Sequence, residues 1–155
     1  MVKICRVLGI PHDALSFNET ERVDTETVAK KLNENTYTHV AIIHCETSSG
    51  IVNPIEDIGQ LVYDHGARKG STVYIVDSMS AFGAIPVSLQ NGQITYIISS
   101  ANKCIEGVPG FAFVVGKKQQ LLTCQGQARS LALDLYDQYT SMEQNRQFRF
   151  TRKLI

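Results

Sequence analysis

An aspartate and a lysine that each follow a short apolar run are the first candidates for chemistry. Asp77 ends the run VYIVD (73–77), and Lys103 follows ITYIIS (94–99) just before a Gly-Val-Pro-Gly turn. A carboxylate at the end of a buried strand is costly to bury unless it is paired or hydrogen-bonded. Taken singly, Asp77 is explained equally well as a cap or loop residue, and Lys103 is more readily a surface lysine. At the ends of consecutive strands, however, the two side chains can face one pocket.

An acid and a lysine at one pocket meet the needs of pyridoxal 5'-phosphate. The aldehyde of this cofactor condenses with a lysine amine, and its ring nitrogen must stay protonated for the ring to withdraw electrons. A carboxylate beside the ring nitrogen keeps that proton in place. The small residues Ser99, Ser100 and Ala101 leave room for a ring. Asp77 and Lys103 therefore predict a site for this cofactor.

The elements that must position these residues alternate along the chain. Short apolar runs predict strands over 38–45, 73–77, 94–99 and 111–115. Helices are predicted over 25–35, 55–66, 117–124 and 128–145. This alternation predicts an α/β fold, a mostly parallel sheet with flanking helices. The last two strands are too close in sequence for a crossover helix, so we expect them to be antiparallel. Ligands bind a parallel sheet at the carboxyl ends of its strands, where the two candidates fall.

Several local signals refine this outline. The first residues resemble the end of a helix that stops at Gly9, and the alternating segment 12–17 predicts a short strand. Asp24 can cap the helix that follows it, and Pro54 suits the first turn of the next helix. The segment 66–71, GARKGS, is interpreted as a solvated surface insertion.

Composition excludes several classes of protein. The chain has 155 residues, enough for one domain with a buried core, and 43% of them are hydrophobic. Fifteen Lys and Arg balance fifteen Asp and Glu, so no bulk charge favours nucleic acid or an anionic membrane. No apolar run approaches the roughly 18 residues of a membrane helix, and no secretory signal is recognised. The four cysteines show no metal-ligand spacing, so we expect no metal site and a reduced, cytoplasmic location.

Four stretches of the chain are shared with a known group of enzymes. They are HCETSSGIVNPIEDI, VDSMSAFGAIP, ISSANKCIEGVPGFAFVV and ARSLALDLYDQY. They closely resemble the 2-aminoethylphosphonate–pyruvate aminotransferases, class V aminotransferases of fold type I. The resemblance runs from Met1 to about Thr151. It implies pyridoxal-phosphate-dependent transfer of an amino group from 2-aminoethylphosphonate to pyruvate, which gives phosphonoacetaldehyde and alanine in phosphonate catabolism.

The resemblance implies a role for several residues. Lys103 matches the Schiff-base lysine and catalytic base, and Asp77 matches the partner of the pyridinium nitrogen. Thr47 matches a hydroxyl near the phenolic oxygen of the ring, and Met79 falls where an apolar side chain packs beneath the ring.

Two further residues are implied to lie near the cofactor phosphate. Asn102 is adjacent to this phosphate in related enzymes. Thr151 matches a residue that reaches the phosphate bound by the neighbouring subunit, which implies a homodimer.

The resemblance also suggests that the chain is a part of a larger fold. The family has a phosphate-binding segment before the position of Met1 and a small C-terminal domain with an arginine for the phosphonate. Residues 1–155 are therefore interpreted as a partial cofactor-binding large domain that lacks both, an incomplete and inactive piece. Two alternatives stay open: an alanine–glyoxylate-type class V aminotransferase, and a non-catalytic remnant that pairs with other subunits.

Three other polar residues near these motifs receive ordinary explanations. We expect His44 to be a hydrogen-bonded core histidine, Cys104 to be a small packing residue, and Glu106 to be solvated.

Overall fold

The computed structural model describes residues 1–150 of the chain, which divides into two compact units. The first unit is Met1–Val114 and the second begins at Val115. The first unit contains, in order, α1 (Val2–Val7), α2 (Thr25–Glu34), β1 (His39–Ile43), α3 (Ile55–Lys69), β2 (Val73–Asp77) and β3 (Tyr96–Ser100). Strand β4 (Ala112–Gly116) begins in the first unit, and the second unit contains α4 (Lys118–Leu122) and α5 (Leu135–Asn145).

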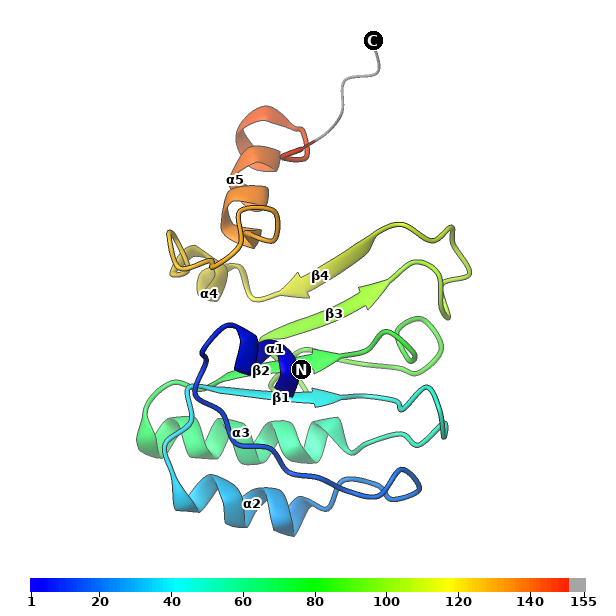
Figure 1. Ribbon diagram of the computed structural model, residues 1–155, viewed down its shortest axis with the longest axis vertical. Helices are drawn as coiled ribbons and strands as arrows, with labels where there is room; N and C mark the ends of the chain where they lie inside the picture. The colour runs from blue at the N-terminus through cyan, green and yellow to red at the C-terminus, as the bar shows by residue number, and fades with distance from the viewer. Residues whose placement is uncertain (151–155) are drawn as a thin grey trace. The chain divides into compact units, whose positions relative to one another are not determined.

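The strands form one sheet in the order β1-β2-β3-β4 (Figure 1). Strands β1, β2 and β3 are parallel, and their register places Ile43 opposite Asp77 and Asp77 opposite Ile98. The arrow of β4 runs against that of β3 in Figure 1, as predicted from their short connection. The prediction of an α/β fold with a mostly parallel sheet is confirmed.

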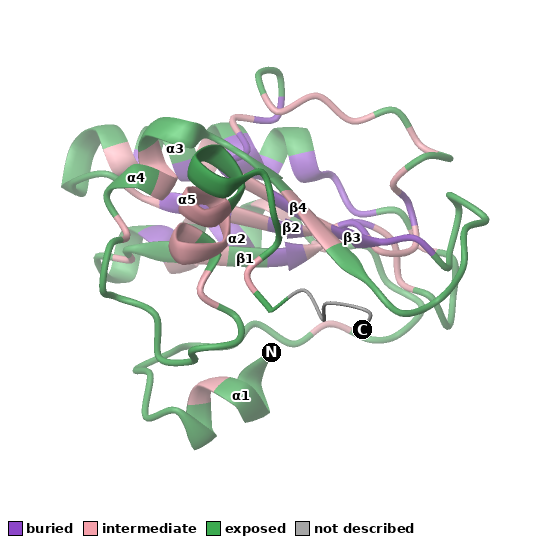
Figure 2. Cartoon of the chain, turned by 90° about the horizontal axis from the view of Figure 1, so that it is seen from above, coloured by how far each residue is buried: buried purple, intermediate pink, exposed green. Residues whose placement is uncertain are grey.

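The core lies between the sheet and two helices. Helix α3 packs against β2, and α2 packs against α3. Apolar side chains from all of these elements form one buried cluster, which includes Val28, Leu32, Ile58, Val62, Tyr74, Val76 and Ile97. Figure 2 shows buried residues on β2, β3 and α3, whereas α1 is mostly exposed. No helix in residues 1–150 is both long and apolar enough to cross a membrane.

Local capping signals place three helix ends correctly. The Asp24 carboxylate accepts a hydrogen bond from the Thr27 backbone N–H at 2.8 Å, which satisfies a free donor in the first turn of α2. Helix α1 ends at Val7, and Gly9 follows with φ of +61°. Helix α3 begins directly after Pro54. These ends depend on single residues, so the sequence alone is enough to find them.

Two predicted elements differ in the structure. Segment 12–17 is not a strand, because its alternating pattern finds no neighbouring strand to pair with among the described residues. Helix α5 begins at Leu135 rather than at 128, because the Asp134 carboxylate caps it there by accepting from the Asp137 N–H at 3.0 Å.

Residues 66–69 of the segment interpreted as a surface insertion belong instead to α3. This helix continues to Lys69, whose amine donates to the backbone carbonyls of Asn33 and Asn35, each at 3.0 Å. These bonds satisfy carbonyl groups at the end of α2, where the helix itself provides no donors. The segment is solvated as expected, but it ties two helices together.

Candidate functional site

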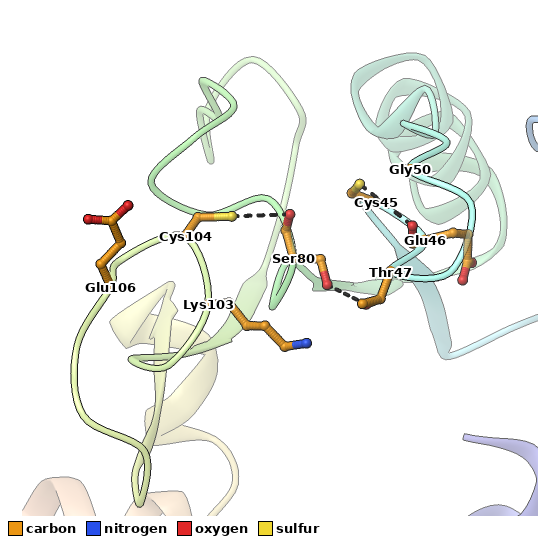
Figure 3. A pocket seen from close by; sticks show the side chains of 8 residues that line it. All are labelled: Cys45, Glu46, Thr47, Gly50, Ser80, Lys103, Cys104 and Glu106. Carbon is orange, nitrogen blue, oxygen red and sulfur yellow. Dashed lines mark hydrogen bonds between the residues drawn. The ribbon is translucent and has the colours of Figure 1, made fainter.

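The loops that follow β1, β2 and β3 surround an open pocket of about 410 Å³. Its lining residues come from all three loops: Cys45, Glu46, Thr47, Gly50, Ser80, Lys103, Cys104 and Glu106 (Figure 3). The pocket therefore lies at the carboxyl end of the parallel strands, the position that the sheet topology predicts for a ligand.

Lys103 is the only lysine among these lining residues. It belongs to a tight turn in which the Glu106 N–H donates to the Lys103 carbonyl at 2.9 Å and the Gly107 N–H donates to the Ala101 carbonyl at 2.8 Å. In Figure 3 its side chain extends toward Thr47 and Ser80, whereas Glu106 points away. An exposed amine held in this way can reach a carbonyl group bound in the pocket.

A pair of hydroxyl groups lies beside the lysine. Thr47 Oγ1 and Ser80 Oγ share a hydrogen bond that joins the loop after β1 to the loop after β2. The sequence analysis identified Thr47 but missed Ser80. A usable signal was present, because Ser80 is a polar residue only three positions beyond Asp77 at the same strand end.

Asp77 lies at the end of β2 and is half-buried. Its carboxylate accepts a hydrogen bond from the Met79 N–H at 3.1 Å, and its backbone carbonyl accepts from the His44 N–H at 2.7 Å. Asp77, Met79 and Asn102 do not line the pocket itself, and Asn102 is exposed. Of the predicted site residues, the structure thus brings Thr47 and Lys103 into one pocket, while Thr151 lies outside the described residues.

A set of buried polar residues supports the strand ends. His44 is buried, and its Nδ1 is hydrogen-bonded to Ser78 Oγ at 3.0 Å, so it is the hydrogen-bonded core histidine that we expected. Burial lowers the pKa of the His44 imidazole, an effect that the Glu56 carboxylate partly opposes. Asn53 donates to the Ile43 carbonyl at 2.9 Å and therefore holds the end of β1 in place.

Cys104 differs from its predicted role. It is exposed rather than packed, and its thiol donates to the Ser80 backbone carbonyl at 3.4 Å. Glu106 is solvated, as expected. All four cysteines lie in the described part of the chain and carry free thiols. No group of three or more potential metal ligands occurs within residues 1–150.

The residues present fit pyridoxal phosphate by their chemistry. In the pocket, Lys103 would offer an amine for the aldehyde and Thr47 a hydroxyl group for the phenolic oxygen. Asp77, at the end of β2 and outside the pocket lining, would offer a carboxylate for the ring nitrogen. At the end of β3, the hydroxyl of Ser100 is buried and has no hydrogen-bond partner in the structure. A buried polar atom of this kind is rare unless something else satisfies it.

Comparison with known proteins relates this chain to a family. The family model for class-V aminotransferases matches residues 1–149. The chain is 47% identical over 153 residues to a 2-aminoethylphosphonate–pyruvate transaminase of Salmonella agona (strain SL483), and equally to one of Salmonella dublin. In both cases the match covers 97% of this chain and 40% of the relative. The chain therefore spans about 40% of the length of the curated relatives that it matches.

Solved structures agree with this relationship. A pyridoxamine–pyruvate aminotransferase from Mesorhizobium loti has a TM-score of 0.65 and 27% identity, over 72% of this chain and 28% of that chain. A ureidoglycine–glyoxylate aminotransferase from Bacillus subtilis has a TM-score of 0.80 over 94% of this chain and 37% of that chain. The second match has 19% identity and shows the fold alone.

Proposed function

Because the chain belongs to the class-V aminotransferase family, we propose that it takes part in pyridoxal-phosphate-dependent amino transfer from 2-aminoethylphosphonate to pyruvate. The products are phosphonoacetaldehyde and alanine, as in phosphonate catabolism. The observation that carries the proposal is the Lys103 amine in one pocket with the Thr47–Ser80 hydroxyl pair, at the carboxyl end of a parallel sheet. The relatives at 47% identity support the choice of substrates.

The proposed roles follow from the chemistry of each side chain. Lys103 would hold the cofactor through its side-chain amine, and the free amine would take the proton from the carbon that bears the substrate's amino group. Asp77 would hold a proton on the ring nitrogen, and the Thr47 hydroxyl, paired with that of Ser80, would donate to the phenolic oxygen. Met79 packs beneath the ring. The cofactor itself supplies an electron sink for the carbon that loses the proton.

The remaining predictions about the site and the assembly belong to the same proposal. Asn102 lies near the cofactor phosphate, and Thr151 reaches the phosphate of a neighbouring subunit in a homodimer. The 155 residues correspond to part of the cofactor-binding large domain of the family. Four free thiols support a cytoplasmic location, and the balanced charge gives no support for nucleic acid as a partner.

Reduction with borohydride tests the role of Lys103. The chain is mixed with pyridoxal phosphate, reduced and digested, and the labelled peptide is identified by mass spectrometry. We expect the label on Lys103 and its loss in Lys103→Ala, while Lys117→Ala serves as a control from outside the pocket lining. A label on Lys30, Lys69 or Lys117 instead would refute the assignment.

Turnover by the 155 residues alone should be very low. The chain spans about 40% of the length of the relatives that it matches. A phosphate dianion needs several positioned donors, and a phosphonate is best recognised by a bidentate arginine. If neither the cofactor nor the substrate is oriented, the reaction loses a proximity effect that can lower its barrier by ~7–11 kcal/mol. The turnover is measured as alanine formed from 2-aminoethylphosphonate and pyruvate. Robust turnover would contradict our view of where the substrate binds.

A further inference from the structure

The loop after β2 contacts both neighbouring loops of the pocket, and Ser80 makes both of these hydrogen bonds. Its hydroxyl bonds to Thr47 Oγ1 in the loop after β1. Its backbone carbonyl accepts from the Cys104 thiol, the residue next to Lys103, in the loop after β3 (Figure 3). One residue therefore links the loops that carry the two predicted site residues of this pocket.

Two further contacts involve the loop after β2. The rings of Phe82 and Phe113 meet edge to face, with centroids 5.3 Å apart and planes at 74°. A Cβ built on Gly83 would be 3.4 Å from Ile105 Cγ1 in the lysine loop, an ordinary van der Waals distance. Gly83 also has φ of +98°, which other residues rarely adopt. The loop after β2 thus packs on β4 through Phe82, in addition to its hydrogen bond with Cys104 of the lysine loop.

We propose that Ser80 is a positioning residue for the cofactor site, which orients the Thr47 hydroxyl and holds the Lys103 loop in register with it. This inference rests on the proposed function, since it concerns how the same pocket binds its cofactor. Thr47 is exposed, so its hydroxyl turns freely among rotamers unless a partner holds it. In the pair one hydroxyl donates to the other, which leaves a single proton to aim at a ligand oxygen.

Two variants separate this role from a general effect on folding. Ser80→Ala removes the bond to Thr47 but keeps the carbonyl that Cys104 uses, whereas Ser80→Thr keeps a hydroxyl at the same place. Ser48→Ala is the matched control, because it removes an exposed hydroxyl that lies next to Thr47 and does not line the pocket.

The first measurement uses the chain without cofactor. Hydrogen exchange is followed at the amides of Glu46 and Gly50, which are hydrogen-bonded within the loop after β1 (3.0 Å and 2.8 Å to carbonyl oxygens). We expect Ser80→Ala to speed their exchange by about 3- to 10-fold, the range for loss of one neutral hydrogen bond. Ser48→Ala should leave the exchange unchanged.

The second measurement uses the chain loaded with pyridoxal phosphate. The yield of the borohydride-trapped Lys103 adduct and the absorbance of the bound cofactor are followed against pH. Ser80→Ala should lower the yield by about 3- to 10-fold at limiting cofactor and shift the midpoint of the absorbance change, because a hydroxyl donor to the phenolic oxygen is no longer oriented. Ser80→Thr should restore both.

The two measurements distinguish the possible failures. Exchange and pH profiles of Ser80→Ala that match those of Ser48→Ala would overturn the inference. Faster exchange without a shift of the pH midpoint would reduce Ser80 to a structural link and would also overturn it. If the native chain forms no Lys103 adduct, the proposed cofactor site is wrong. The link between the loops is tested independently of this result, because unchanged hydrogen exchange in Ser80→Ala would refute it.

Discussion

Replacing Gly59 by alanine should destabilise the protein, although the same change in most helices is stabilising. Gly59 is buried in the interior of α3. A Cβ built on it would lie 1.9 Å from the carbonyl oxygen of Gly92, 2.8 Å from its carbonyl carbon and 3.1 Å from Cε1 of Tyr74. Two of these three atoms are backbone, so no rotation of a side chain relieves the contact.

The expected magnitude follows from two opposing terms. Glycine is about 1 kcal/mol less favourable than alanine in a helix interior, which favours the variant. An ordinary contact needs 3.4 Å, so the Gly92 carbonyl would have to retreat about 1.5 Å from its present 1.9 Å. Overpacking of this kind costs about 1–3 kcal/mol, and a clash with backbone belongs at the upper end. The net loss of stability is therefore about 2 kcal/mol.

Urea unfolding of the 155-residue chain measures this loss. At an m-value of about 1–3 kcal/mol/M, we expect the midpoint of Gly59→Ala to fall by about 1 M. Gly66→Ala is the matched control in the same helix, since the nearest atom to its Cβ would be the Thr72 nitrogen at 3.0 Å, followed by Thr72 side-chain atoms at 3.4 and 3.5 Å. The helix preference should offset much of that smaller cost. If Gly59→Ala is as stable as the native chain, the close approach of α3 to Gly92 is wrong.

Two further predictions concern buried polar groups. Asn53→Ala should lower the free energy of unfolding by about 2–3 kcal/mol. The Asn53 side chain donates to the Ile43 carbonyl and accepts from the Val23 N–H, so both backbone groups lose a hydrogen bond. An unchanged urea midpoint would contradict this prediction. Burial lowers the pKa of His65 below the ordinary ~6.5, so the unfolded chain binds the proton first and stability falls as pH drops below about 6.5. His65→Gln should reduce that fall in urea midpoints measured across the range, while the exposed His39→Gln should not.

Helix ends and strand positions were predictable wherever neighbouring residues decide them. The start of α2 depends on Asp24 and its bond to the Thr27 N–H, three residues away. Strand β2 covers the predicted residues 73–77, because a continuous apolar run is stable only when buried on both faces. The start of α5 was predicted at 128, whereas the Asp134 carboxylate caps the helix, which begins at Leu135. Segment 12–17 failed for a different reason, since a strand needs a partner that its own sequence cannot supply.

The candidate site was likewise predictable only where local sequence decides it. The sequence alone determined the α/β order, the family, and the position of Asp77, Thr47 and Lys103 at strand ends, because these depend on local runs and distinctive motifs. Only the tertiary structure decided which of them share a pocket. Ser80 meets Thr47 across 33 positions of the chain, and this pairing depends on the parallel arrangement of β1 and β2, in which Ile43 lies opposite Asp77. Contacts between residues so far apart follow from strand order, register and packing, which no local pattern specifies.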